Sequence, residues 1–296
     1  MKTLADLGED GLVRLITKNL RTDADVLLGP GDDCAVVQPP ARGRKLVLKT
    51  DTLVEGVHFT ADTPPALIGR KAIARVLSDF AAMAALPHHA LITLIAPPST
   101  EVRRVTAIYR GMDRMADEFG VRIVGGETSR GSQLVLTVSM TGSVPARGWV
   151  ARSSAKAGDI LIVTGTLGGS IHGKHLKFTP RLREAGSIMA WLHPTAMMDI
   201  SDGLAKDLPR LAASCGLGFE LDPDQVPVTP GCTLEQALND GEDYELLIAA
   251  HPDRAQTALE KLRRSFPRTG FHIIGKLVPA QHRRQLLSGG WDHFQK

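Results

Sequence analysis

The chain has 296 residues, of which 43% are hydrophobic and 23% charged, a composition typical of a globular protein long enough for two domains. Its 35 Lys and Arg residues nearly balance 32 Asp and Glu residues, and only 4% of residues are aromatic, which excludes a basic, base-stacking surface for nucleic acid. No apolar run approaches the roughly 20 residues that cross a bilayer. We therefore expect a cytoplasmic protein with neither a nucleic-acid nor a membrane partner.

The first half alternates predicted helices and strands. The chain opens on an amphipathic helix interrupted by acids, a pattern unlike that of a secretion signal. Apolar residues at helical spacing and short leucine-rich or β-branched runs then predict the following elements. They are a strand at 45–50, a helix at 65–85, a strand at 89–98, a helix at 101–120, and strands at 121–124 and 132–144. This order indicates a β-α-β unit with added strands.

A polar, glycine-containing segment at 145–159 predicts a domain boundary, with domains at 1–145 and 146–296. The second half again alternates, so the expected fold class is α/β in two halves. Its predicted strands lie at 160–165, 195–200, 244–250 and 271–278, and its helices at 179–192, 201–216 and 253–266. The three cysteines are scattered without a C-x-x-C pair, which predicts neither a disulfide framework nor a zinc site.

Carboxylates occur where predicted apolar runs begin or end, often beside glycine. In α/β sheets, ligands bind at the ends of strands, where loops converge. Carboxylates with Ser and Thr hydroxyls are hard oxygen donors, which suit magnesium, calcium or manganese better than zinc or copper. The acids concerned are Asp32-Asp33, Asp51, Glu127 after Gly125-Gly126, Asp199 and Asp202 around Ser201, and Glu242-Asp243.

Each group of acids also has a structural alternative. The pairs at 32–33 and 242–243 can be solvated turns. Gly125-Gly126 can be a plain turn or a platform for close approach of a ligand. The acids around Ser201 can cap the helix that follows, whose N-terminus is also a natural anion site. The residues alone leave these alternatives open, while the recurrence of the pattern favours a ligand site.

One phosphate-binding pattern is incomplete. The stretch "GGSIHGKH" at 168–175 matches seven positions of the P-loop pattern G-x-x-x-x-G-K-[ST] and follows a predicted strand. Its last residue is His175, which has no hydroxyl to bind magnesium, so we do not expect a P-loop. The patterns G-x-S-x-G, H-E-x-x-H and G-x-G-x-x-G are absent, which disfavours common hydrolases, zinc proteases and dinucleotide enzymes.

Eight motifs taken together resemble the thiamine-monophosphate kinase family over nearly the whole chain. In chain order they are "GDDCAVV", "TDTLVEGVHF", "LSDFAAMAA", "GVRIVGGETSRG", "RSSAKAGDILIVTGTLGGS", "MMDISDGLAKDL", "GEDYELL" and "GWDHF". The resemblance implies the two-domain α/β (α+β) fold of the aminoimidazole ribonucleotide synthetase-like superfamily, which uses ATP without a P-loop. It implies an N-terminal domain that forms a barrel with its mate in a homodimer, and a C-terminal α/β domain with a mixed sheet.

The resemblance also implies a reaction, in which ATP and thiamine monophosphate give ADP and thiamine diphosphate, and a role for each matched residue. The magnesium ligands would be Asp33, Thr50, Asp51, Asp79, Glu127, Asp199 and Asp202. The ATP contacts would be Tyr109, Gly125, Gly126, Arg152 and Ser201. The contacts to thiamine monophosphate would be His58, Glu242 and Trp291. The residues that act in phosphoryl transfer would be Asp51, Asp79, Asp199 and Arg152.

The chemistry of the residues agrees with this reaction. ATP and a phosphomonoester together bring about six negative charges, so a site with many carboxylates needs divalent ions between them. Phosphoryl transfer depends mainly on positioning and charge neutralisation, which metals and an arginine supply without a protein nucleophile. The aspartate pair at 32–33 is therefore interpreted as part of a magnesium site, and the resemblance implies that Asp33 is the ligand of the two.

The chain departs from the family pattern at a few positions. Glu127 replaces an aspartate, Gly169 stands where aspartate is common, and the segment after Ser170 is short. Arg75 replaces an asparagine four residues before Asp79, with which it can also form a surface ion pair. Two other functions stay open: a related ATP-dependent enzyme of the superfamily with another acceptor, and a catalytically impaired nucleotide-binding paralogue.

Overall fold

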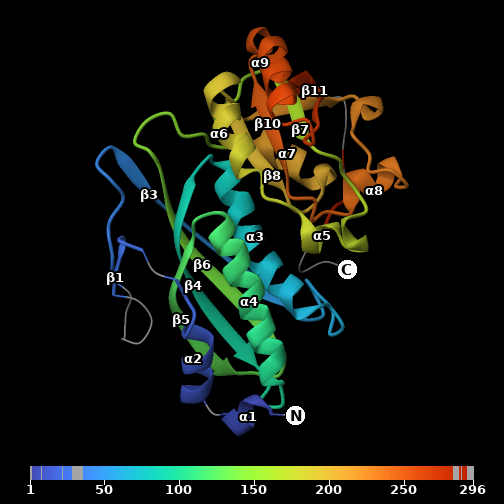
Figure 1. Ribbon diagram of the computed structural model, residues 1–296. Helices are drawn as coiled ribbons and strands as arrows, with labels where there is room; N and C mark the ends of the chain where they lie inside the picture. Colours follow the sequence, from blue (N-terminus) through green and yellow to red (C-terminus); the bar gives the residue numbers. More distant parts are fainter. Residues whose placement is uncertain are drawn as a thin grey trace. The chain divides into compact units, whose positions relative to one another are not determined.

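The computed structural model describes residues 2–7, 9–21, 23–28, 36–282, 287 and 289–291. The chain divides into two compact units (Figure 1). Unit 1 comprises Met1–Leu77 and Leu86–Ala146, and unit 2 comprises Ser78–Ala85 and Arg147–Lys296. The short stretch at 78–85 thus leaves the N-terminal half and belongs with unit 2. Among the described helices, none has the length and apolar character that crossing a membrane requires.

Unit 1 is built on a four-stranded mixed sheet in the order β3-β6-β4-β5, in which only β4 and β5 are parallel. Its strands are β3 (Arg44–Val54), β4 (Leu86–Ala96), β5 (Arg122–Arg130) and β6 (Val135–Pro145), with a separate β1 (Val26–Leu28) and β2 (Val36–Val37) pair. Its helices are α1 (Leu4–Leu7), α2 (Glu9–Thr17), α3 (Pro65–Ala82) and α4 (Val102–Glu118). The predicted N-terminal helix is therefore two short helices.

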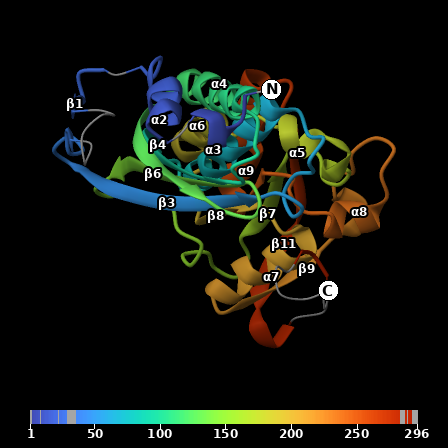
Figure 2. The same ribbon diagram turned by 90° about the horizontal axis from the view of Figure 1, so that it is seen from below.

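Helices α3 and α4 cover one face of this sheet (Figures 1 and 2). Successive side chains of a strand point to opposite faces, and on the covered face Leu136, Val138 and Met140 of β6 are at most 1% exposed. The opposite face carries Leu46 and Leu48 of β3 and Leu91 of β4, which are 55%, 70% and 45% exposed. The uncovered face is therefore apolar in part.

Two glycines let α3 and α4 touch backbone to backbone. A Cβ atom on Gly69 would lie 1.9 Å from the Ile108 carbonyl oxygen, and one on Gly111 would lie 2.0 Å from the Ala66 carbonyl oxygen. Real Cβ atoms do not approach backbone this closely, so the crossing of the two helices requires glycine at both positions.

Unit 2 contains a five-stranded sheet in the order β8-β10-β7-β11-β9. The strands are β7 (Ile160–Thr164), β8 (Ala196–Ile200), β9 (Leu217–Leu221), β10 (Glu245–Ala250) and β11 (Phe271–Pro279). The longer helices are α6 (Leu182–Trp191), α7 (Leu204–Ser214) and α9 (Pro252–Ser265). Short helices lie between them: η1 (Ser170–His172), α5 (Lys174–Lys177), η2 (Pro223–Gln225), α8 (Leu234–Asn239) and η3 (Ala280–His282).

The sheet of unit 2 differs from the expected mixed sheet, because all four of its strand pairings are antiparallel. A βαβ crossover would make β7 and β8 parallel neighbours, but β10 lies between them and pairs with both. The mixed sheet lies in unit 1 instead. Strand β9 and helix α8 were not among the predicted elements; β9 is a five-residue edge strand and α8 spans six residues.

Helices cover both faces of this sheet. Alternate residues of β10 divide between two apolar clusters: Leu247 and Ala249 pack with α7, and Leu246 and Ile248 pack with α6 and α9. All six residues of β10 are buried, as expected for a strand covered on both faces. The face with α6 and α9 also buries Ala81 and Ala82, which is why the end of α3 belongs to unit 2.

We predict that Gly111→Ala lowers the free energy of unfolding by about 1 to 3 kcal/mol, the usual cost of overpacking a core. The added methyl group would force α3 and α4 apart at a contact between backbones. The matched control is Gly186→Ala in α6, where no atom lies within 4 Å of the new Cβ. There alanine should stabilise by about 0.4 to 1 kcal/mol. Calorimetric unfolding of both variants checks the prediction, and equal melting temperatures would contradict it.

Candidate active site

Unit 1 contains a groove of about 1310 Å³, larger than the roughly 300 to 1,000 Å³ of most small-molecule sites. It brings together predicted site residues from three elements: Thr50, Tyr109, Gly125, Gly126 and Glu127. Helix α2 adds an apolar wall of Val13, Ile16 and Leu20. The amphipathic pattern of this first helix predicted an apolar face but not that the face would line a groove.

The segment Gly125-Gly126-Glu127 lies inside β5, so both its expected position at a strand end and the plain-turn alternative are wrong. The paired strand β4 shifts register between Ala90 and Leu91, next to this segment. A Cβ on Gly126 would lie 1.9 Å from the Ile92 carbonyl oxygen, so the close pairing of the strands requires glycine there. Glu127 is exposed and lines the groove.

Thr50 and Asp51 also lie inside a strand, β3, and not at its end as expected. Adjacent residues of a strand point to opposite faces. Thr50 Oγ1 lies 3.0 Å from Ser139 Oγ, whereas the Asp51 carboxylate lies 3.4 Å from Lys49 Nζ. The two side chains therefore do not converge on one point.

Two further predicted residues of unit 1 are held by neighbours. Tyr109 in α4 is 7% exposed, and burial raises the pKa of its hydroxyl. The turn that carries His58 is fixed from both sides: the Val54 N–H donates to His58 Nδ1 at 3.1 Å, and the buried Lys71 ammonium donates to the His58 carbonyl at 2.7 Å. Because Nδ1 accepts a hydrogen bond, the imidazole hydrogen lies on Nε2.

In unit 2, the end of α3 meets the end of β8. Asp199 is the fourth residue of β8 and is 4% exposed. Its Oδ2 accepts a hydrogen bond of 2.7 Å from the Ser78 hydroxyl. Asp79 is the next residue of α3, so a second acid follows directly on the residue that binds Asp199. Ser78 stands in the same "LSDFAAMAA" motif, but the sequence analysis assigned it no role.

The alternative that the acids around Ser201 cap α7 is wrong. The N-cap residue is Gly203, and the acceptor comes from inside the helix: Asp207 Oδ2 accepts from the Ser201 and Asp202 N–H groups at 3.0 and 2.9 Å. Burial, and to a smaller extent the charges of Asp202 and Asp199, raise the pKa of Asp207 to about 6. Asp207 lies in the quoted motif "MMDISDGLAKDL", but no local pattern distinguished it from a surface acid of the predicted helix.

Asp202 itself is surrounded by cations and by the C-terminal segment. Its Oδ2 lies 2.5 Å from Arg210 Nη1 and 3.8 Å from Lys206 Nζ. The Trp291 N–H donates to the Asp202 carbonyl at 2.8 Å, and the Trp291 side chain is 49% exposed. Within this unit the indole therefore remains accessible beside Asp202.

The segment before β10 joins the same loop. The Glu242 N–H donates to the Ser201 carbonyl at 2.7 Å, and the Tyr244 N–H donates to the Ile200 carbonyl at 2.9 Å. Glu242 is half-buried and structured, so the solvated-turn alternative for this acid is wrong. The structure thus gathers Asp79, Asp199, Ser201, Asp202, Glu242 and Trp291 around the end of β8.

The structure does not bring Arg152 to this cluster. The Ser214 hydroxyl donates to the Arg152 carbonyl at 2.8 Å, at the C-terminal end of α7, whereas Asp202 precedes its N-terminal end. Eleven helical residues span about 16 Å. The Arg152 side chain is exposed. The other predicted ligand, Asp33, lies outside the described residues.

Two departures from the family pattern have local reasons. Gly169 has a positive φ of 70°, and a Cβ there would lie 2.5 Å from Cys232 Sγ, so aspartate does not fit. Arg75 Nη1 donates to the Thr52 carbonyl at 3.0 Å and ties α3 to β3 one residue beyond Asp51.

The donor set suits magnesium, although no group of three or more His, Cys, Asp or Glu side chains within the described ranges forms a metal site. Magnesium takes oxygen ligands and commonly uses one or two carboxylates together with substrate phosphates and water. Asp199, with one carboxylate oxygen fixed by Ser78, meets that requirement.

Comparison with known proteins identifies the family. Models of the AIR synthase related protein N-terminal and C-terminal domains match residues 31–144 and 156–285. The thiamine-monophosphate kinase of Synechococcus elongatus is 34% identical, with 99% of this chain and 98% of that protein covered.

Solved structures agree with this match. The thiamine-monophosphate kinase of Stenotrophomonas maltophilia superposes with a TM-score of 0.78 at 31% identity, covering 90% of this chain and 92% of that chain. The structure of AaThiL complexed with AMPPCP and TMP gives a TM-score of 0.75 at 29% identity over 99% of both chains. The chain therefore belongs to the thiamine-monophosphate kinase family of AIR synthase related proteins.

Proposed function

We propose that the chain transfers the terminal phosphoryl group of ATP to thiamine monophosphate, giving thiamine diphosphate and ADP. One structural observation carries this proposal: Glu242 and Trp291 are hydrogen-bonded by their main chains to Ser201 and Asp202, next to the buried Asp199. Glu242 and Trp291, which are suited to bind an organic acceptor, thus lie beside acids that are suited to bind a metal with phosphate. A relative that covers the whole chain has been solved with an ATP analogue and TMP, which supports the same assignment.

Around β8, the proposed roles follow from accessibility and charge. Asp79, Asp199 and Asp202 would hold magnesium, and Ser201 would contact ATP. Glu242 accepts hydrogen bonds from thiamine monophosphate. The half-exposed indole of Trp291 stacks on one of its rings, since the cationic thiazolium suits an electron-rich face. Arg152, an exposed residue at the opposite end of α7 from this cluster, is proposed to neutralise phosphate charge away from the acids around β8.

In unit 1, the groove is the proposed nucleotide site. Tyr109 and the Gly125-Gly126 backbone contact ATP, and Glu127 serves as a metal ligand from the groove wall. Asp51, Thr50 and Asp33 are each proposed as magnesium ligands, and because Thr50 and Asp51 point to opposite faces of β3 their side chains would not share one ion. His58 contacts thiamine monophosphate through Nε2–H, since Nδ1 is occupied by Val54.

Magnesium, when bound, would neutralise the charge that develops on the transferred phosphoryl group. The protein's own part is to hold the carboxylates and to orient the acceptor. Ser78 fixes one oxygen of Asp199, and Arg210 with Lys206 offsets the charge of Asp202 until ligands arrive. No protein nucleophile is required.

We expect the purified protein to release ADP from ATP only when magnesium and thiamine monophosphate are both present. Thiamine, which lacks the acceptor phosphate, is the control and should give background release. ADP formation is measured by a coupled assay and thiamine diphosphate by chromatography. Absence of the diphosphate in excess magnesium would reject the kinase and favour an impaired nucleotide-binding paralogue.

Asp199→Asn should lower kcat by about 100-fold or more, since losing one group that stabilises charge in the transition state typically has this cost. The fold should be kept, because the asparagine oxygen still accepts from Ser78. Asp253→Asn in α9, where the carboxylate is exposed, is the matched control and should keep wild-type rates. Turnover of Asp199→Asn near that of the control would remove Asp199 from the site of transfer.

We further propose a homodimer formed through the uncovered face of the unit 1 sheet. This face exposes Leu46, Leu48 and Leu91. Exposed apolar side chains are stabilised when a partner removes them from water, and because Leu48 and Leu91 also line the proposed nucleotide groove, the partner would border that groove. A second copy of the same face is self-complementary and closes the assembly at two chains.

Light scattering at micromolar concentration should give the mass of two chains. Leu46→Glu should shift the mass toward one chain, because a carboxylate buried between two sheets is costly. Ile171→Glu, at a residue of unit 2 that is 74% exposed, is the control and should leave the mass unchanged. A monomeric wild-type protein would contradict the proposal.

We propose a cytoplasmic location on a separate observation. Cys215 and Cys232 are free thiols. Unpaired, partly accessible cysteines persist in reducing compartments.

A further inference from the structure

Glu242, the proposed acceptor-site acid, has an unusual backbone. Its φ is 53°, and Tyr244, two residues later, has the same value. Residues with a Cβ atom adopt this left-handed conformation at a cost of about 1 to 2 kcal/mol each. Two such residues in one short segment persist only where surrounding contacts hold them, and such strain is concentrated at functional sites.

Contacts from residues 175–178 and from Tyr244 hold the Glu242 carboxylate. His175 Nδ1 lies 3.1 Å from Glu242 Oε2. The Tyr244 hydroxyl donates to Glu242 Oε1 at 3.0 Å. The Tyr244 ring stacks on Phe178 with ring centres 4.2 Å apart. Each carboxylate oxygen of Glu242 thus has its own donor, and stacking on Phe178 fixes the Tyr244 ring that carries one of them.

The glycine-rich loop that carries His175 is fixed by the residue next to Glu242. Asp243 is fully buried, and its Oδ1 accepts from the Gly168 N–H at 3.0 Å, the Ser170 hydroxyl at 2.8 Å and Lys174 Nζ at 3.2 Å. Burial raises the pKa of Asp243 to about 6, against the opposing effect of Lys174. These donors, which would cradle a phosphate in a P-loop, converge on one carboxyl oxygen of the same chain, Asp243 Oδ1.

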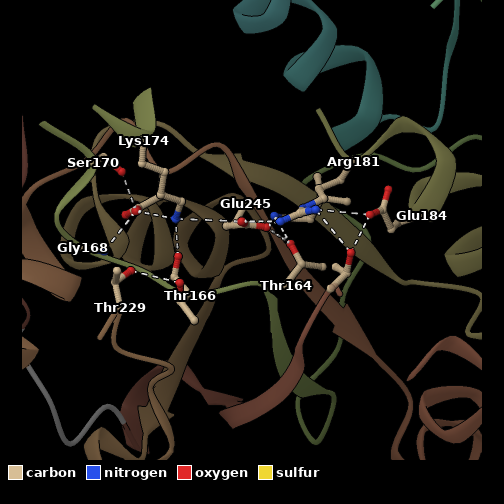
Figure 3. Close-up of polar contacts among 12 residues, drawn as sticks. Thr164, Thr166, Gly168, Ser170, Lys174, Arg181, Glu184, Thr229 and Glu245 are labelled. Carbon is tan, nitrogen blue, oxygen red and sulfur yellow. Dashed lines mark hydrogen bonds and ion pairs between the residues drawn. The ribbon is translucent and has the colours of Figure 1, made fainter. Parts of the chain in front are cut away.

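A second ion pair, between Arg181 and Glu245, stabilises the same attachment of the glycine-rich loop. Figure 3 shows Glu245 between the two basic side chains, Lys174 and Arg181. Arg181 binds Glu245 through two hydrogen bonds of 2.7 Å, and the Thr164 hydroxyl adds a third of 2.7 Å. Gly165 must be glycine here, because a Cβ would lie 2.2 Å from Glu245 Oε1. Asp243 and Glu245 therefore anchor the loop, while Glu242 and Tyr244 contact each other at its side.

We propose that His175 and Tyr244 are positioning residues that orient the Glu242 carboxylate for thiamine monophosphate, and that Asp243 locks the glycine-rich loop at 168–175 in the place this requires. The inference rests on the proposed function in one respect, the contact between Glu242 and thiamine monophosphate. The loop is thus a support for the acceptor site and not a phosphate-binding loop.

The test compares KM and kcat for variants that change one contact each. His175→Ala removes the donor to Oε2, and Tyr244→Phe removes only the hydroxyl and keeps the ring on Phe178. Each should raise KM for thiamine monophosphate about 10-fold, with KM for ATP and kcat within about 2-fold of wild type. His175→Asn should restore a low KM, because its amide nitrogen can replace Nδ1. His172→Ala, at an exposed histidine of the same loop, is the matched control.

A double-mutant cycle separates positioning from general damage. In a Glu242→Gln background, His175→Ala and Tyr244→Phe should change KM by less than about 2-fold, because the oriented carboxylate is already lost. Melting temperatures of Tyr244→Phe and His175→Asn should match wild type. An active wild type in which His175→Ala behaves like His172→Ala, or in which the effects are independent of Glu242, overturns the inference alone. A wild type that does not phosphorylate thiamine monophosphate overturns the proposed function, and the inference with it.

Discussion

Two main-chain hydrogen bonds decide where the site of unit 2 can form. The N–H groups of Glu242 and Tyr244 donate to the carbonyls of Ser201 and Ile200, at the end of the pairing between β8 and β10, where Ile200 is the last paired residue of β8. These two hydrogen bonds extend the contact between β8 and β10 into the adjoining loops. Both donor residues have a left-handed backbone conformation. A segment with ordinary β conformation would separate from the loop after β8 and leave Glu242 away from Asp202. The acceptor side of the site therefore depends on strain at two residues.

Holding the carboxylates around the end of β8 close together costs electrostatic free energy, and the fold does not require this arrangement. Asp199 is buried and Asp207 has a pKa raised to about 6 by burial, with repulsion from Asp202 and Asp199 adding to it. Arg210, paired with Asp202 and Asp207, offsets part of this charge. A sequence that specified only a stable fold would place apolar residues at such positions, since buried charge rarely adds stability. Local conflicts of this kind are expected at functional sites.

The sequence predicted well the elements whose patterns are periodic and long. The helices at 65–85 and 101–120 correspond to α3 and α4, and the apolar run at 244–250 to β10. It placed Asp51 and Glu127 at strand ends because a carboxylate breaks an apolar run. In the structure, β3 and β5 continue through these residues, and an edge strand tolerates polar side chains. In β5 the buried residues end at Val124, before the strand does, whereas in β3 the one buried residue, Leu53, follows Asp51.

Other features of the site depend on contacts between residues that are far apart in the sequence, and no local sequence pattern predicts such contacts. The separation of Arg152 from Asp202 follows from the length of α7 and the anchor at Ser214. The positive φ of Glu242 is set by loops that join it from two sides. The family resemblance named Asp199, Asp202, Glu242 and Trp291 together, and the main-chain contacts give a physical reason why they occur in one place.

The glycine-rich loop shows why composition alone is a weak guide to phosphate binding. Its spacing satisfies most of the P-loop pattern, and its N–H groups and lysine do converge on an anion, as such a loop predicts. The anion is Asp243, a fixed charge of the same chain. A P-loop releases its phosphate with each turnover, whereas the anion of this loop is a side chain that stays attached to the chain. The same backbone chemistry thus serves to hold His175 beside Glu242 instead of to bind a nucleotide.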